Sequence, residues 1–115
     1  MTDKELLELA AKAAGIELTQ GYGEPAWRCM FYQDENYECF YWNPIDDDGD
    51  ALRLAVKLRI DVMTDCPNSV CIEVPVGKKD NWITECTKDD SFENVLIATR
   101  RAIVRAAAEI GRSMK

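Results

Sequence analysis

The sequence predicts an α+β fold in which helices cover a sheet on both faces, as a layered helix/sheet/helix sandwich. Three segments carry apolar residues at helical spacing, and the segments between them alternate apolar and polar residues as strands do. A chain of 115 residues, 47% of them hydrophobic, can build one core without disulfides or metals. We therefore expect a single domain over 1–115 with a mostly antiparallel sheet of roughly four to five strands, in the order α-β-β-α-β-β-(β)-α.

An amphipathic helix is predicted at the N-terminus, within residues 1–15. Thr2 and Glu5 have the spacing of a capping box, in which each side chain satisfies the backbone N–H of the other residue. Gly15 supplies a C-terminal stop. The apolar residues that share one face of this helix are Leu6, Leu9, Ala10 and Ala13. A loop, the core over 26–112 and a flexible tail at 113–115 follow.

Two aromatic-rich segments, "AWRCMFYQ" and "YECFYWN", predict a β-hairpin around the polar turn Asp34-Glu35-Asn36. If the turn consists of these residues alone, Cys29 and Cys39 lie on the same face of the hairpin. The aromatic side chains carry so much apolar area that another layer must cover one sheet face. They belong to Trp27, Phe31, Phe40 and Trp42.

The stretch "NPIDDDGDALRLAVKLRI", Asn43 to Ile60, predicts a second helix that begins in an acidic run. At about 100° per residue, its apolar side chains cover an arc of about 200°, so we expect the helix to be largely buried. These side chains belong to Ala51, Leu52, Leu54, Ala55, Val56 and Leu58.

The acidic run itself, Asp46, Asp47, Asp48 and Asp50, raises the question of a calcium loop. An EF-hand that starts at Asp46 needs glycine at its sixth position and glutamate at its twelfth, where this chain has alanine and lysine. Capping of the helix explains the run better, because aspartates satisfy free N–H groups and complement the positive end of the helix dipole. A weak divalent-cation site and an acidic surface for a protein partner stay open as alternatives.

Short strands follow the second helix. "DVMT" predicts one, "NWITECT" predicts another, and "SVCIEVPVG" between them alternates clearly. Its apolar face consists of Val70, Ile72, Val74 and Val76. Because Pro75 cannot donate to a ladder, this strand lies at an edge of the sheet or ends there.

The longest helix is predicted from Phe92 to Ile110, with Asp90 and Glu93 as a capping box and Gly111 as its end. Its core stripe consists of Phe92, Val95, Leu96, Thr99, Ile103, Ala106 and Ile110. Ile97, Val104 and Ala108 form a second apolar stripe on another side. That stripe either packs against a neighbouring helix or offers Ile97 and Val104 as a self-association surface.

The residues resemble those of the phage ABA-sandwich domain, a family of small phage-encoded and prophage-encoded proteins. The similar segments are "YWNPIDDDGDALRLAVKL" and "ATRRAIVRAAAEIG", within a region from Trp27 to Gly111. The resemblance implies the helix/sheet/helix layering and a phage or prophage origin. It implies no catalytic residues.

Composition limits the functions that this sequence can be expected to have. The net charge of −7 disfavours direct binding to DNA or to an anionic membrane. The chain has no histidine, its five cysteines form no CxxC, and it contains no nucleotide-binding or hydrolase motif. We therefore expect no catalysis, no cofactor and no metal site. With no signal-like N-terminus and no long apolar run, we expect a cytoplasmic protein in the host cell.

Arginines on the last helix are the main candidates for binding an anion. Arg100, Arg101 and Arg105 recur along it, and guanidinium groups bind phosphate or carboxylate through paired hydrogen bonds. A solvated face that complements the negative end of the helix dipole is the alternative interpretation. Trp27, Tyr41 and Trp42 could stack on the base of a nucleotide.

Two functions are compatible with these features. The first is a non-enzymatic phage accessory protein that binds a host protein, for example a defence factor, in an anti-defence role, or a replication factor. The second is a small protein that sequesters an anionic metabolite or nucleotide. A homodimer is compatible with either function.

Overall fold

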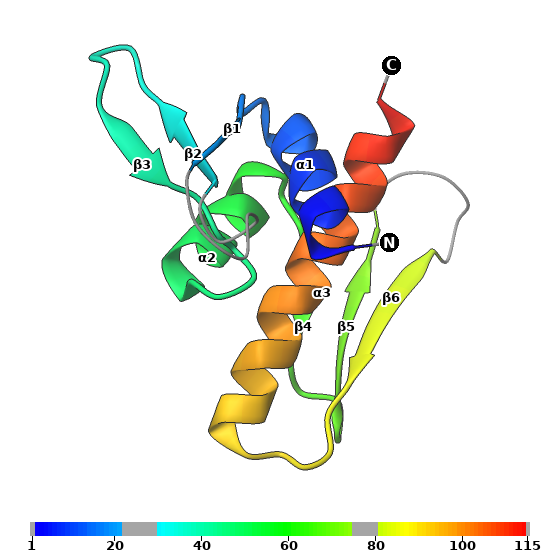
Figure 1. Cartoon of the computed structure of the whole chain (residues 1–115). Coiled ribbons are helices and arrows are strands. Elements are labelled where there is room, and N and C mark those ends of the chain that lie inside the picture. The colour runs from blue at the N-terminus through cyan, green and yellow to red at the C-terminus, as the bar shows by residue number, and fades with distance from the viewer. Residues whose placement is uncertain (1, 22–29, 75–80, 115) are drawn as a thin grey trace.

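The fold is an α+β arrangement of three helices and two antiparallel sheets within the described residues (Figure 1). The computed structural model describes residues 2–21, 30–74 and 81–114. The helices are α1 (Asp3–Ala14), α2 (Asp48–Lys57) and α3 (Phe92–Ser113). The strands are β1 (Thr19–Gln20), β2 (Met30–Gln33), β3 (Cys39–Tyr41), β4 (Val62–Met63), β5 (Ser69–Glu73) and β6 (Trp82–Cys86).

The predicted α+β class is confirmed, but a single sheet of four to five strands and the predicted element order are not. One sheet, here sheet A, has the order β1-β2-β3, and the other, sheet B, has the order β4-β5-β6. Helix α2 separates the two sheets along the chain. Strand β1 was missed because it has only the two polar residues Thr19 and Gln20, which carry no apolar alternation.

Helix α1 has the predicted caps. The side-chain oxygen of Thr2 accepts a hydrogen bond from the Glu5 backbone N–H at 3.2 Å. Gly15 ends the helix in the left-handed region, at φ 72°, where glycine avoids the strain of a side chain. The buried face, however, is rotated around the helix from the predicted one: Leu6 and Ala10 are buried as predicted, but Leu9 and Ala13 are only half-buried. The buried residues are Leu6, Leu7, Ala10, Ala11 and Ala14.

Helix α3 is the centre of the fold, because α1, α2 and sheet B all contact it (Figure 1). The sequence predicted that Gly111 ends this helix, but Gly111 lies inside it, because α3 continues to Ser113. A Cβ atom at Gly111 would overlap the carbonyl oxygen of Leu9 and lie 2.8 Å from its carbonyl carbon. The glycine therefore allows the backbones of α1 and α3 to approach closely.

The predicted faces of α3 need two corrections. Val104 has no exposed surface and lies about 20° around the helix from Gly111, on the side of α1, so it belongs to the core and cannot mediate self-association. Phe92, in the first turn of α3, is 79% exposed and therefore does not belong to the core stripe. Ile103, 4% exposed, is buried as predicted.

The start of α3 also differs from the prediction. Its N-cap is Ser91, whose hydroxyl accepts from the Asn94 N–H at 3.4 Å. Asp90 instead accepts the backbone N–H of Asn68 at 2.9 Å and thereby ties the helix start to sheet B.

Sheet B follows the predicted alternation. Val70 and Ile72 are fully buried on the face toward α3, and β5 pairs with β6 so that Ile72 lies opposite Ile83. Strand β5 ends at Glu73 and is the central strand of its sheet. Pro75 and Val76 lie outside the described residues.

Helix α2 is less buried than predicted. Only Ala51, Leu54 and Ala55 are buried, whereas Leu52 is 64% exposed and Val56 is 65% exposed. The helix contacts α3 through this narrow face, and its opposite side meets solvent, so the broad apolar arc did not indicate full burial.

The backbone is strained at Arg59, just after the C-terminus of α2. The N–H of Arg59 donates to the Val56 carbonyl, and the N–H of Ile60 donates to the Ala55 carbonyl. Arg59 has φ 57°, a left-handed backbone conformation that glycine usually adopts at the end of a helix.

The hairpin of sheet A has a longer turn than predicted. Gln33 pairs with Cys39, and the N–H of Asp34 donates to the Glu38 carbonyl at 3.0 Å. The extra length is possible because Tyr37 adopts φ 64°. The predicted proximity of Cys29 and Cys39 cannot be placed, because Cys29 lies outside the described residues.

Candidate functional site

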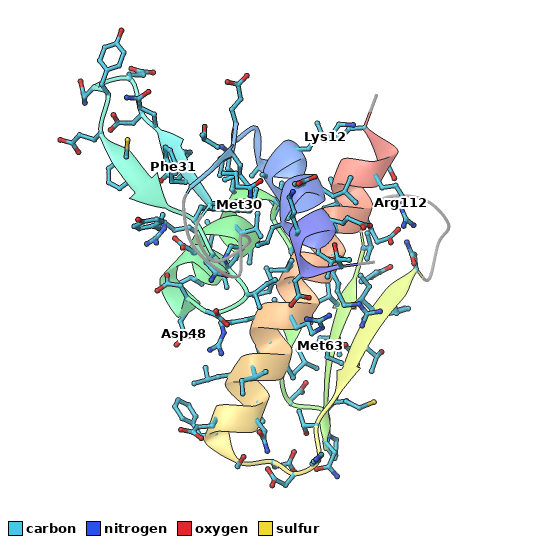
Figure 2. All side chains as sticks on the ribbon, in the orientation of Figure 1. Lys12, Met30, Phe31, Asp48, Met63 and Arg112 are labelled. Atoms are coloured by element: carbon cyan, nitrogen blue, oxygen red, sulfur yellow. The ribbon has the colours of Figure 1, made fainter. Side chains whose placement is uncertain are left out.

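The three candidate arginines of α3 do not form one site. Arg100 points toward the start of α2, where its Nε donates to the Ile45 carbonyl at 2.8 Å and its Nη1 lies 2.6 Å from Asp48. Its side chain is only 16% exposed. Figure 2 shows Asp48 at the N-terminal end of α2. Arg100 therefore ties two helices together.

Arg101 and Arg105 come together at Glu85, an acidic side chain of β6. Arg105 Nη1 lies 2.6 Å from one Glu85 carboxylate oxygen, and Arg101 Nε lies 3.4 Å from the other. Arg101 also contacts Asp3, at the start of α1, at 3.1 Å. The side chains of Arg101 and Arg105 are 39% and 38% exposed and line an open cavity of about 590 Å³.

The candidate aromatic residues do not join these arginines. Trp42 is 4% exposed and belongs to the core, so it is not accessible for stacking on a ligand. Tyr41 is 74% exposed on β3 and lines a different cavity, with Thr19 and Phe31. Trp27 lies outside the described residues.

The acidic run caps α2, as the sequence predicted. Asp47 is the N-cap and accepts from the Asp50 N–H at 2.8 Å. Asp50 accepts from the Asn43 N–H at 2.9 Å and from Arg53 at 2.7 Å. Asp46 accepts from the side-chain amide of Asn43 at 3.1 Å. Across residues 2–21, 30–74 and 81–114, no cluster of acidic, cysteine or histidine side chains has an arrangement that could hold a metal ion.

The cysteines within the described ranges are free thiols. Cys39 and Cys86 are exposed, and Cys66 and Cys71 are half-buried. A hydrogen bond with Cys71, followed by desolvation, raises the pKa of the Cys66 thiol, which lowers its reactivity near neutral pH.

The outer face of sheet B carries a surface that the sequence did not single out. On this face Glu73 lies opposite Trp82, and Met63 lies opposite Cys71. Trp82 is 45% exposed and Met63, labelled in Figure 2, is 41% exposed. An open cavity of about 620 Å³ is lined by Arg59, Asp61, Val62, Met63, Glu73 and Trp82, which we call the Trp82 surface.

Two sequence signals could have revealed these residues. The alternation of "NWITECT" places Trp82 on the face opposite Ile83, so burial of Ile83 implies an exposed tryptophan. The same alternation turns Glu85 toward the helix layer, where an acidic side chain needs a cation. Arg101 and Arg105, one helical turn apart, are the available cations.

Ile97 is 53% exposed near the start of α3 and lines a smaller open cavity with Glu85 and Arg101. This exposure keeps Ile97 as a contact candidate after Val104 has been assigned to the core.

In the part of the chain that the structure describes, no helix combines the length and the hydropathy that crossing a membrane requires. Comparison of the chain with known protein families, curated proteins and solved structures found no match.

Proposed function

We propose that this protein is a non-enzymatic binding protein whose partner is another protein, and that the Trp82 surface is the contact. In the setting that the resemblance to phage proteins implies, the partner is a bacterial defence or replication factor in the host cytoplasm. Binding, with no reaction of its own, is the whole activity in this proposal.

The main support for the proposal is the exposed Trp82 side chain. Trp82 and Met63 present a large aromatic and a flexible apolar side chain on the same sheet face. Tryptophan is enriched among the few residues that supply most of the binding energy in protein interfaces, and methionine adapts to irregular partner surfaces. Neither the Trp82 nor the Met63 side chain packs into the core, because both point away from α3.

The charge around Trp82 favours a basic partner. Among the described residues that line this cavity, Asp61 and Glu73 are acidic and Arg59 is the one cation. A lysine or arginine side chain of the partner can lie over the indole ring and pair with these carboxylates. The net charge of −7 supports the same choice, because it accelerates the encounter with a positively charged protein.

The test is affinity capture from a bacterial lysate with the wild-type chain and two variants. Trp82→Ser removes the proposed contact, and Tyr41→Ser removes a tyrosine that is 74% exposed on the other sheet. We expect wild type and Tyr41→Ser to retain the same basic protein and Trp82→Ser to lose it. Retention should also weaken between low salt and about 0.5 M NaCl, because salt screens the charged contacts.

Two results would contradict the proposal. One is that no protein is retained even at low salt. The other is that Trp82→Ser, folded as judged by circular dichroism, retains the partner as well as wild type does.

Sequestration of a small anion is the second candidate, and the exposed donors of Arg101 and Arg105 in one cavity favour it. Their carboxylate partners Asp3 and Glu85 weigh against it, because an anion would have to displace them. A thermal-shift screen against nucleotides and cyclic nucleotides tests this candidate. A ligand at 100 times its dissociation constant stabilises the fold by about 2.7 kcal/mol, and a panel without any shift would rule against this function.

A further inference from the structure

Among the described residues, strand β6 is an open edge of sheet B, because the strand order is β4-β5-β6 (Figure 1). The N–H of Val74 donates to the Asn81 carbonyl at 2.8 Å, which fixes the phase of the pairing between β5 and β6. Hydrogen-bonded and non-bonded residues alternate along an antiparallel pair. Trp82, Thr84 and Cys86 therefore turn their N–H and C=O groups away from β5.

These outward groups are available to another strand. Within the described residues, the N–H groups of Trp82, Thr84 and Cys86 have no hydrogen-bond partner. The Thr84 carbonyl accepts one bond, from Arg105 at 3.3 Å, and a carbonyl oxygen can accept a second. Natural edges are commonly blocked by proline or lysine, and β6 contains neither.

The edge of the other sheet differs from β6 at one outward N–H. At the end of β3, the outward N–H of Asn43 donates to the Asp50 carboxylate at 2.9 Å. That bond occupies one outward N–H beyond the end of β3 with an acidic side chain. Along β6, the described residues place a side chain on one outward carbonyl, that of Thr84, but on no outward N–H.

A groove accompanies the open edge of β6. It consists of two open cavities, of about 590 and 290 Å³, which share Glu85 and Arg101. Arg105 hydrogen-bonds through Nη1 alone among the described residues, so its Nε and Nη2 donors remain for an incoming acceptor. An extended segment that carries a carboxylate on its groove side fits both the edge and these donors.

We propose that β6 of a second copy of this chain is that segment, paired antiparallel with a two-fold axis at Thr84. In this register Thr84 faces Thr84 of the second copy, and Trp82 faces Cys86. Each outward N–H then meets an outward carbonyl, because the same residues point outward in both copies. The proposal is independent of the function proposed above.

The charge of Glu85 is compatible with this pairing. A charged side chain that points toward the covered face usually discourages strand addition. Here Arg101 and Arg105 hold Glu85 of their own chain. Glu85 of the second copy lies opposite Ile83, where it approaches the remaining donors of Arg105. The strand therefore supplies the carboxylate for which the groove has spare donors.

The dimer would join two sheets of three strands into one continuous sheet. Both Trp82 surfaces would then lie on the same outer face, because the two-fold axis is perpendicular to the sheet. A partner with two matching sites would bind both, which raises the apparent affinity without any new contact.

Sedimentation velocity of the full chain tests the proposal over roughly 10 µM to 1 mM, the range in which weak dimers form. Measurements at 0.15 M NaCl screen charge repulsion between the copies beyond about 8 Å. We expect wild type to shift from monomer to dimer with concentration. Thr84→Pro, which removes an outward N–H but no bond to β5, should stay monomeric, and the control Thr84→Val should behave like wild type.

A second readout needs no substitution. Cys39 and Cys86 are both exposed, but only Cys86 faces the second copy in the dimer. Alkylation of Cys86 should be at least about threefold slower at the highest concentration, because only unpaired chains expose it fully, whereas the rate for Cys39 should stay constant. A wild-type chain that is monomeric throughout, or equal rates for the two thiols at all concentrations, would overturn the proposal. If Thr84→Pro does not fold, the thiol comparison decides alone.

Discussion

Substitution of Gly111 by alanine tests the central packing contact of the fold, between α1 and α3. A glycine in an exposed helix interior costs about 1 kcal/mol relative to alanine, so an exposed Gly111 would make Gly111→Ala stabilising. The structure predicts the opposite sign. The added methyl group would overlap the carbonyl oxygen of Leu9, which belongs to a backbone and cannot rotate away. The two helices would have to separate.

The magnitude follows from the cost of overpacking. An extra methyl group in a tight contact costs about 1–3 kcal/mol, and overlap with a backbone atom belongs at the upper end. After the gain in helix propensity, a net loss of about 2 kcal/mol is expected. With an unfolding entropy of about 2.1 cal/mol/K per residue, this loss lowers Tm by about 8 °C in a chain of 115 residues.

Urea unfolding and thermal melts of wild type, Gly111→Ala and Gly49→Ala measure the effect. Gly49→Ala is the matched control, because its added methyl group meets only flexible side-chain atoms, at 3.2–3.3 Å from Arg53 and Asp47. It should leave the stability unchanged or raise it by up to about 1 kcal/mol. Our account of the interface between α1 and α3 would be refuted if Gly111→Ala were as stable as wild type or more stable.

Ile103→Asp places an unpaired carboxylate at a position that is 4% exposed, so we expect this variant to lose its cooperative thermal melt. Asp47→Ala removes only the N-cap of α2 and should lower the free energy of unfolding by about 0.5–2 kcal/mol. Equal melting of the two variants would contradict this prediction. Arg59→Gly relieves a left-handed φ of 57° and should raise the free energy of unfolding by about 1 kcal/mol in urea titrations, and a loss of stability would argue against the strain. Hydrogen bonds from Ser91 and Asn94 lower the pKa of Asp89 below its ordinary 3.8. The stabilisation of the fold by the deprotonated Asp89 side chain is therefore complete above that pH and is lost as the pH falls through the lowered pKa. The difference in stability between wild type and Asp89→Asn should therefore shrink in acid, and a difference that grows below pH 4 would contradict the assignment.

Much of the local structure could be predicted from the sequence because local chemistry determines it. The capping pattern at Thr2, the aspartate cap at Asp47 and the alternation around Ile72 all depend on neighbours within a few residues. For the same reason Gly15 was correctly placed at the end of α1.

The errors concern contacts that depend on distant segments. Whether Gly111 ends a helix or lies within one depends on Leu9, about a hundred positions earlier in the chain. The burial of Val104 depends on the neighbouring helix α1, and the exposure of Phe92 depends on how far the sheet and α2 extend along α3. Periodicity identifies an apolar face but does not show how many other elements cover it.

The candidate site was predicted only in part, because cations can be recognised along a helix but their partners cannot. The sequence singled out Arg100, Arg101 and Arg105 as one anion-binding set, but their carboxylate partners, Asp48 and Glu85, come from two different elements and divide the set. Trp82 was missed because a tryptophan in a short strand is equally compatible with a core position and an exposed one.

Nuclear magnetic resonance of the ¹⁵N-labelled chain, with the captured partner added, tests protein binding through the Trp82 surface at the level of single residues. We expect the signals of the Trp82 indole N–H and of the backbone amides of Met63 and Glu73 to shift when the partner is added, while the indole signal of the buried Trp42 stays in place. Shifts confined to the Arg101–Arg105 cavity or to the acidic start of α2, with the Trp82 indole unchanged, would contradict it.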